Sequence, residues 1–313
     1  MSALICGSYA FDSIMVFNDQ FKNHILPDKT HMINVSFLVP EMRRNFGGCA
    51  GNIAYNLKLL GGNPLPMASV GTDFTPYRDW MTKCAIEQKY IRVIDNSFTG
   101  QAFITTDMDD NQITAFHPGA MSFSHELSIN DVDEKIAIGI VSPDGRDGMI
   151  QHAREFYENN IPFIFDPGQG LPMFDGSDLK RFIEQATWVA ANDYEAQLIQ
   201  ERTGLSPHEV AEHVDAYIIT LGAKGSHIYV KEHRYEIPAA KPTEISDPTG
   251  CGDAFRAGLL YGLSNNLGWE VTGRIASLMG AIKIENHGPQ NHQFTKEEFA
   301  KRYEENFGST ISL

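Results

Sequence analysis

The sequence has few basic residues, few cysteines and no long apolar run, and each shortage argues against a class of protein. Lys and Arg number 25 against 40 Asp and Glu, so the net charge of −15 argues against a nucleic-acid partner. The four cysteines form no C-x-x-C pair, so we expect neither a zinc site nor disulfides. We therefore expect the protein to lie in the cytoplasm. No apolar stretch approaches the roughly 18 residues of a membrane span, and residues 1–17 do not resemble a signal peptide, so no membrane partner is expected.

Two common nucleotide-binding signatures are also missing. Lys224 is followed by Gly225 and not by Ser or Thr, so there is no Walker A motif. Residues 250–252 begin a G-x-G-x-x-G pattern, but Phe255 stands at the third glycine and the stretch lies near the C-terminus, which makes a Rossmann dehydrogenase a weak alternative. The eleven histidines show no ligand spacing, so a histidine metal site is not expected.

Short apolar runs alternate with helical patterns along much of the chain. Strands are expected at residues 3–6, 68–70, 136–141, 163–165, 188–191, 216–220 and 227–230. Helices are expected at residues 151–159, 194–203 and 207–212. This alternation predicts an α/β fold, with a mostly parallel central sheet flanked by helices and with ligands at the carboxyl ends of the strands.

Residues 11–46 and 99–117 break this rhythm. Residues 102–106 and 112–116 alternate between apolar and polar, and residues 109–111 between them are typical of a hairpin turn. We therefore predict a single domain over residues 1–313 that carries a small β-sheet lid, and a lid indicates a ligand that must be shielded from water. Within the hairpin, Phe116 should point to the face opposite Ile113.

The stretch "SDPTGCGDAFRAGLLYGL" (residues 246–263) places a carboxylate, Asp253, at the start of a predicted helix. The free N–H groups and the dipole of a helix start favour an anion, so a phosphate could lie beside Asp253. Gly250 and Gly252 flank the single Cys251, which suits close approach of a ligand to the main chain. A simpler interpretation is that Asp253 and the glycines only cap a surface helix. A helix cap, however, does not require two glycines that expose the main chain.

A second glycine cluster, "FGGCAGNIAYNLKLLGG" (residues 46–62), also precedes a predicted helix. Gly47 and Gly48 lie before its first turn, and Asn52 lies within that turn. Tight packing of the helix on a neighbour explains the glycines but not the polar Asn52, so structural and ligand-binding interpretations both stand. Asp12, after the first expected strand, could accept two hydrogen bonds from a vicinal diol.

Together these motifs resemble the ribokinase-like (PfkB) kinase family across nearly the whole chain. The five that carry the resemblance are, in order, G-x-x-x-x-D at 7–12, G-G-x-x-x-N at 47–52, N-x-x-E at 192–195, T-x-G-x-x-G at 220–225 and D-x-T-G-x-G-D at 247–253. Within the family, stretches such as "FHPGAMS" (116–122) and "DPTGCGDAFRAG" (247–258) are similar to bacterial adenosine kinases. Pro248 favours a nucleoside, since sugar kinases more often have Thr there.

The resemblance implies an adenosine kinase that transfers a phosphoryl group from ATP to the 5′-hydroxyl of adenosine, giving AMP and ADP in purine salvage. It implies Asp253 as the base and the amides of Gly250, Cys251 and Gly252 as the anion hole. The nucleoside residues that it implies are Ser8, Asp12, Ser36, Gly47, Gly48, Asn52, Phe103, Phe116 and Gln169. The implied ATP residues are Asn192, Thr220, Gly222 and Gly225, with Glu195 organising Mg²⁺ through water.

Three alternatives stay open from the sequence. The same scaffold would serve a sugar kinase or a nucleoside kinase of broad specificity, because only the residues that face the base differ. A catalytically silent binding protein is disfavoured by Asp253 and the paired glycines. A homodimer through the lid is the expected assembly, since lid strands present unpaired edges that a second subunit could cover.

Overall fold

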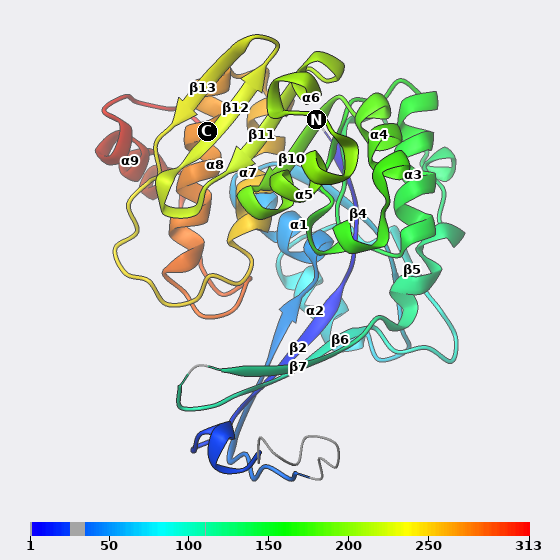
Figure 1. The fold of residues 1–313 in the computed structure, drawn as a ribbon, viewed down its shortest axis with the longest axis vertical. Helices are drawn as coiled ribbons and strands as arrows, with labels where there is room; N and C mark the ends of the chain where they lie inside the picture. Colours follow the sequence, from blue (N-terminus) through cyan, green and yellow to red (C-terminus); the bar gives the residue numbers. More distant parts are fainter. Residues whose placement is uncertain (1, 26–34, 110) are drawn as a thin grey trace.

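The computed structural model describes residues 2–25, 35–109 and 111–313, and Figure 1 shows an α/β body from which a small sheet projects. The strands of the body are β1 (Ser2–Cys6), β4 (Asn63–Val70), β5 (Tyr90–Val93), β8 (Ile136–Val141), β9 (Phe163–Phe165), β10 (Trp188–Asn192), β11 (Ala216–Thr220), β12 (Ser226–Val230) and β13 (His233–Ile237). They lie in the order β13-β12-β11-β10-β9-β8-β1-β4-β5. Only the pairs β11/β12 and β12/β13 are antiparallel, which confirms the mostly parallel sheet.

Helices cover both faces of this sheet, because alternate apolar residues of the inner strands point to opposite sides. One face packs against α1 (Cys49–Leu59), α2 (Thr75–Lys83), α7 (Cys251–Ser264), α8 (Trp269–Ile284) and α9 (Lys296–Phe307). The other face packs against α3 (Arg146–Glu158), α4 (Gly176–Gln185), α5 (Asp193–Thr203) and α6 (Pro207–His213). Short 3₁₀ helices span Phe21–Asn23, Gly119–Glu126, Ile129–Asp131, Gly168–Met173 and Gly222–Lys224.

All seven strands expected from apolar runs are present, and so are the three expected helices. Helix α3 begins at Arg146, five residues before its expected start at residue 151. Its polar first turn, with Arg146 and Asp147, follows Gly145 and conceals the start of the apolar pattern. Among the described residues, no helix combines the length and the apolar character that crossing a membrane requires.

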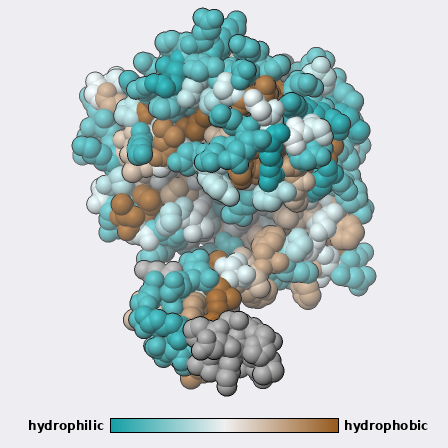
Figure 2. Space-filling model, viewed as in Figure 1, coloured by the Kyte–Doolittle hydropathy of each residue, from teal (hydrophilic) through white to brown (hydrophobic). Residues whose placement is uncertain are grey.

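The projecting sheet is the lid expected from residues 11–46 and 99–117. It contains β2 (Ala10–Val16), β3 (Glu41–Gly47), β6 (Gly100–Thr106) and β7 (Gln112–His117), in the order β3-β2-β6-β7. The hairpin of β6 and β7 is antiparallel as expected, although residue 110 of its turn and residues 26–34 of the first lid segment lie outside the described residues. Figure 2 shows the lid as a separate lobe with a recess between it and the body.

Candidate active site

Helix α7 begins at Gly250, inside the motif that predicts an anion site. Gly250 has φ 82°, and a Cβ there would lie 2.6 Å from Pro289 Cβ, so a larger residue would be strained. The Cys251 amide, expected in the anion hole, instead donates to the Pro248 carbonyl at 3.1 Å, because residues 248–251 close a turn. The amides of Gly250 and Gly252 have no hydrogen-bond partner within the described residues. These two amides and the dipole of α7 can hold an anion.

The loop before α7 is fixed by two groups, Asp247 and Lys283. The Asp247 carboxylate accepts from the amides of Thr249 at 2.9 Å and Gly288 at 2.8 Å. Lys283 is fully buried in α8, and its Nζ donates to the carbonyls of Asp247 at 2.7 Å and Asn286 at 2.9 Å. Lys283 therefore ties the segment after α8 to the loop that carries the free amides. The sequence analysis missed it, although a lone lysine in the apolar run of α8 is a visible signal.

The carboxylate of Asp253 lies in the first turn of α7 and points toward α1. Its Oδ2 accepts a hydrogen bond from Asn52 Nδ2 at 2.8 Å. Burial raises the pKa of Asp253 to about 7, although the hydrogen bond from Asn52 opposes this shift. The group is therefore a carboxylate that exchanges its proton near neutral pH, as a general base requires. Asn52 is expected from the sequence to bind the ribose hydroxyls, and in the structure its side chain contacts the carboxylate of Asp253.

One turn after Asp253, Arg256 forms a buried ion pair with Asp166. The Arg256 Nη2 atom lies 2.9 Å from Asp166 Oδ1, and both side chains are almost fully buried. Asp166 follows β9 directly, so the pair lies at the carboxyl end of the sheet, where this fold class binds ligands. The sequence analysis did not single out either residue. An aspartate directly after the apolar "FIF" of β9 is the signal that could have indicated Asp166.

A second acidic group, Asp12, lies on lid strand β2 near the junction with the body. Burial and then the negative charge of Asp247 raise its pKa to about 6. A Cβ at Gly47 would lie 2.4 Å from Asp12 Oδ2, so Gly47 provides the space for this carboxylate. Gly48 has φ 85° and begins α1, and Ser8 Oγ accepts from the Cys49 amide at 3.2 Å. The structure thus gathers Ser8, Asp12, Gly47 and Gly48 at the base of the lid.

The two lid phenylalanines lie on opposite faces of the lid sheet. Ala102 pairs with both Asp12 and Phe116, which puts Phe116 on the face of Asp12. Phe103 pairs with Ser13 and Ala115, on the other face. Both rings are exposed, Phe116 at 53% and Phe103 at 43%. The expectation that Phe103 also stacks on the base is therefore not supported, since the alternation of β6 turns its ring away from Asp12.

Ser36 and Gln169 lie at the surface. Ser36 precedes Phe37, whose ring packs on Phe17 at a centroid distance of 4.8 Å, and this places Ser36 in the loop that leads into β3. Gln169 lies in the 3₁₀ helix that starts two residues after Asp166. No hydrogen bond joins either side chain to the described residues of the site, so their part in ligand binding stays a prediction.

The predicted ATP residues gather at the carboxyl ends of β10 and β11. Asn192 pairs with Thr220 across these strands. The Asn192 side chain accepts from the Glu195 amide and Glu195 Oε2 accepts from the Asn192 amide, each at 2.8 Å, so the N-x-x-E motif forms a capping box. Burial and then the charge of Asp166 raise the pKa of Glu195. Gly222 and Gly225 have φ 58° and 92°, and a Cβ on Gly222 would meet open space.

The fold, the open amides and the carboxylate of Asp253 together fit a phosphotransferase. A family model described as pfkB family carbohydrate kinase matches residues 13–296. The chain belongs to the pfkB family of carbohydrate kinases. A nucleoside kinase of Methanocaldococcus jannaschii is 33% identical to this pfkB kinase over 273 residues, which cover 87% of this chain and 89% of that protein.

Solved structures of a Burkholderia thailandensis nucleoside kinase are also similar to this pfkB kinase. The complex of that protein with inosine has a TM-score of 0.89 at 50% identity and covers 98% of this chain and 99% of its own. Its complex with ADP-inosine has a TM-score of 0.87 at 52% identity, with coverage of 99% and 97%. The family and the ribokinase-like fold are thus confirmed. The relatives named here are nucleoside kinases, which does not single out adenosine kinases.

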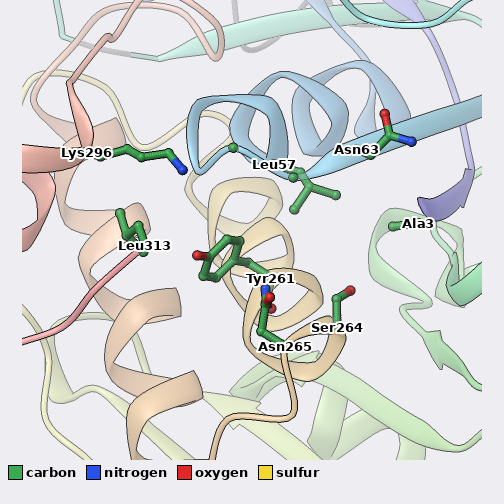
Figure 3. Close-up of a pocket in the computed structure, with 10 residues that line it drawn as sticks. Ala3, Leu57, Asn63, Tyr261, Ser264, Asn265, Lys296 and Leu313 are labelled. Atoms are coloured by element: carbon green, nitrogen blue, oxygen red, sulfur yellow. The ribbon is translucent and has the colours of Figure 1, made fainter. Parts of the chain in front are cut away.

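A separate pocket of this pfkB kinase lies at the opposite end of α7 (Figure 3). Tyr261 and Ser264 of α7 and Asn265 just after it line the pocket, and Lys296 and Leu313 face them from the C-terminal region. Ser264 is eleven residues beyond Asp253, which places it about 16 Å along the helix axis from the base. This pocket is therefore not part of the site formed at the start of α7.

Proposed function

We propose that this pfkB kinase transfers the γ-phosphoryl group of ATP to the 5′-hydroxyl of a nucleoside, with adenosine as the expected acceptor. The observation that carries the proposal is the position of Asp253, a partly buried carboxylate with a pKa raised to about 7 in the same helical turn as the open amides of Gly250 and Gly252. A base beside an anion site is what phosphoryl transfer to a hydroxyl requires. The similar proteins named as nucleoside kinases support a nucleoside as the acceptor.

In this mechanism Asp253 accepts the proton of the 5′-hydroxyl as that oxygen attacks the γ-phosphorus. The amides of Gly250 and Gly252 and the dipole of α7 then stabilise the negative charge on the transferring phosphoryl group. Asp12 accepts hydrogen bonds from the ribose hydroxyls in the space that Gly47 leaves open. Phe116, on the same face of the lid as Asp12, covers the purine and helps to exclude water.

For ATP we assign Asn192, Thr220, Gly222 and Gly225, which lie together after β10 and β11. Within the described residues, no group of three His, Cys, Asp or Glu side chains could hold a metal ion. A Mg²⁺ carried by the ATP phosphates fits this donor set, since Mg²⁺ keeps most of its waters and needs few protein ligands. Glu195 would contact those waters through the oxygen that the capping box leaves free, and the ion would neutralise phosphate charge.

The acceptor class is tested by measuring ADP release with a panel of adenosine, inosine, ribose and fructose. The proposal predicts kcat/KM for the two nucleosides at least a hundredfold above that for either sugar, because a sugar lacks the base that Phe116 would cover. A higher kcat/KM for ribose or fructose would favour the sugar-kinase alternative. Similar values for adenosine and inosine would favour a nucleoside kinase of broad specificity.

A dimer through the lid is the assembly that we propose. The lid face opposite Asp12 carries three exposed apolar side chains on three of the four lid strands, Met42, Phe103 and Ile113. A second copy that covered this face would remove them from water. Sedimentation analysis should give twice the monomer mass, and Phe103→Ser should shift the equilibrium toward monomer. A wild-type protein that is monomeric at all measured concentrations would contradict the proposed dimer.

A further inference from the structure

A chain of hydrogen bonds leads away from Asp253 through three side chains, Asn52, Gln290 and Trp80. Gln290 lies between α8 and α9 and is 2% exposed. Its Nε2 donates to Asn52 Oδ1 at 2.9 Å, and its Oε1 accepts from the indole Nε1 of Trp80 at 2.9 Å. Asn52 Nδ2 in turn donates to Asp253 Oδ2 at 2.8 Å. The same Gln290 nitrogen also lies 2.5 Å from the hydroxyl of Tyr77, which donates to the Gly47 carbonyl at 2.9 Å.

The direction of every bond in this chain is fixed by its two ends. An indole N–H can only donate, so the Gln290 oxygen must face Trp80 and the Gln290 nitrogen must face Asn52. The Asn52 oxygen must therefore accept, and its nitrogen is left to face Asp253. At the other end an ionised carboxylate can only accept, which demands the same orientation of Asn52. Reversing either amide would place two donors or two acceptors together in a buried site, at a cost in free energy.

We propose that Gln290 is a positioning residue that fixes the Asn52 amide with its nitrogen toward the Asp253 carboxylate, and that the Trp80 N–H sets the direction of Gln290. This inference rests on the proposed function, in which Asp253 is the base. A donor held on Asp253 Oδ2 stabilises the ionised carboxylate and leaves Oδ1 for the attacking hydroxyl. Through Tyr77 and Gly47 the same network reaches the end of lid strand β3.

Other charged or titratable groups also face Asp253, and each could change its ionisation. A test of Gln290 must therefore leave these groups in place. They are Cys49 of α1, Tyr77 of α2, Asp166 after β9, and Cys251 and Arg256 of α7. Of these, Tyr77 is the one that Gln290 contacts. A substitution at Gln290 leaves the ion pair of Asp166 and Arg256 in place and changes the contacts of Asn52 and Tyr77. Of these two, Asn52 is the one that is hydrogen-bonded to Asp253, so a change in the ionisation of Asp253 reports mainly on Asn52.

The test variants are Gln290→Met, which keeps a similar volume without polar atoms, and Trp80→Phe, which removes only the indole donor and the second ring. With the nucleoside and ATP saturating, Gln290→Met should lower kcat about tenfold and raise the acid-limb pKa of kcat by about one unit, with the KM for ATP unchanged. Trp80→Phe should shift the same limb in the same direction by less, since the Gln290 amide is then free to turn.

Tyr55→Phe is the matched control. The Tyr55 hydroxyl donates to the His292 carbonyl at 2.5 Å from the same helix as Asn52, so its removal costs a comparable buried hydrogen bond without contacting Asn52 or Asp253. Its pH profile should match that of the wild type. Folded Gln290→Met and Trp80→Phe variants with wild-type kcat and an unchanged acid limb would overturn the proposal. If Gln290→Met does not fold, Trp80→Phe alone decides it by the same criterion.

A measurement that does not use activity separates this proposal from the proposed function. The side-chain carboxyl ¹³C signal of Asp253, assigned by its loss in Asp253→Asn, is titrated by NMR in the wild type and in both variants. Its pKa should rise in Gln290→Met and Trp80→Phe. A rise in a protein that does not phosphorylate nucleosides would uphold the positioning role and contradict the function. An unchanged pKa in an active kinase would contradict the positioning role alone.

Discussion

The Asn52 side-chain nitrogen donates to the Asp253 carboxylate across 2.8 Å, and this bond joins two residues that are 201 positions apart in the sequence. Each lies in the first turn of a helix that begins at a glycine with positive φ, Gly48 for α1 and Gly250 for α7. The two glycine clusters of the sequence therefore form a single site, because α1 and α7 pack side by side with their N-termini together. One cluster supplies the carboxylate that we propose as the base, and the other supplies the donor that holds it.

The pKa of Asp253 predicts the acid side of the pH profile. Because the base must be ionised, kcat/KM should fall below about pH 7, and a second loss is expected below about pH 6 as Asp12 becomes protonated. Above pH 7 both carboxylates are ionised, so neither should change kcat/KM further. Initial rates at subsaturating nucleoside from pH 5 to 9 measure it, with a coupled assay verified at each pH. A rate that stays constant down to pH 5 would contradict the raised pKa values as the origin of the acid limb.

Asp12→Ala should weaken nucleosides that carry the ribose hydroxyls more than those that lack them. A hydrogen bond to a charged group contributes about 1.5–3 kcal/mol, so binding of adenosine should weaken by roughly tenfold to a hundredfold. Binding of 2′,3′-dideoxyadenosine, which has no diol, is the internal control and should change little. Calorimetric titration of both ligands into wild type and variant gives the comparison. Equal losses for the two ligands would show that Asp12 does not contact the diol.

Phe116→Ala should raise the KM for adenosine severalfold, because aromatic stacking contributes about 0.5–1.5 kcal/mol beyond burial. The melting temperature should change little, since the ring is 53% exposed, whereas a core Phe would cost about 3–5 kcal/mol. Phe103→Ala is the matched control, with a similarly exposed ring on the opposite face of the lid. Its KM should be that of the wild type. If instead Phe103→Ala has the larger effect on KM, the assignment of the two lid faces is wrong.

Lys283→Met should damage the anion site through the loop that carries it. Two carbonyls, of Asp247 and Asn286, lose their donor, and the free energy of unfolding should fall by about 1–3 kcal/mol. The KM for ATP should rise, because the amides of residues 250–252 are no longer held. Urea unfolding and ATP titrations measure both effects. Lys296→Met, at an exposed lysine of the separate pocket, is the control and should leave both unchanged.

Much of the fold could be predicted from the sequence because its signals are local. The inner strands are short apolar runs, and the lid hairpin alternates at a period of two, so both are visible without tertiary contacts. The positions of Asp253 and the glycines at helix starts are predictable for a related reason, since a helix start needs particular residue types at fixed spacing. The N-x-x-E motif is also readable as a capping box, because Asn at the N-cap and Glu three residues later are the residue types that such a box requires.

What could not be predicted depends on contacts between distant residues. Gln290 is an ordinary polar residue until the fold buries it against α1, and the lone lysine in the apolar run of α8, Lys283, does not reveal from the sequence which carbonyls it contacts. Arg256 acquires its partner, Asp166, from 90 positions away. The face of Phe103 follows from the register of β6 with β2, which alternation within one strand does not determine. Similarly, the turn that occupies the Cys251 amide is a property of the folded loop.

Asp253→Asn separates catalysis from stability in a single variant. In the wild type the native state binds the Asp253 proton more tightly than the unfolded state does, since the pKa rises from 3.8 to about 7. This group therefore reduces stability as pH rises from about 4 to about 7, and its cost is complete above that range. Asn carries no charge, so Asp253→Asn should melt at pH 8 no lower than the wild type.

The most direct measurement is single-turnover transfer of ³²P from [γ-³²P]ATP to adenosine by wild type and Asp253→Asn at pH 8, with the product identified as the 5′-monophosphate. We predict that the variant is folded, binds adenosine with the wild-type affinity and transfers phosphate about 10²–10⁴ times more slowly. Transfer at the wild-type rate by a folded Asp253→Asn protein would contradict the account, and so would a wild-type product phosphorylated at any other hydroxyl.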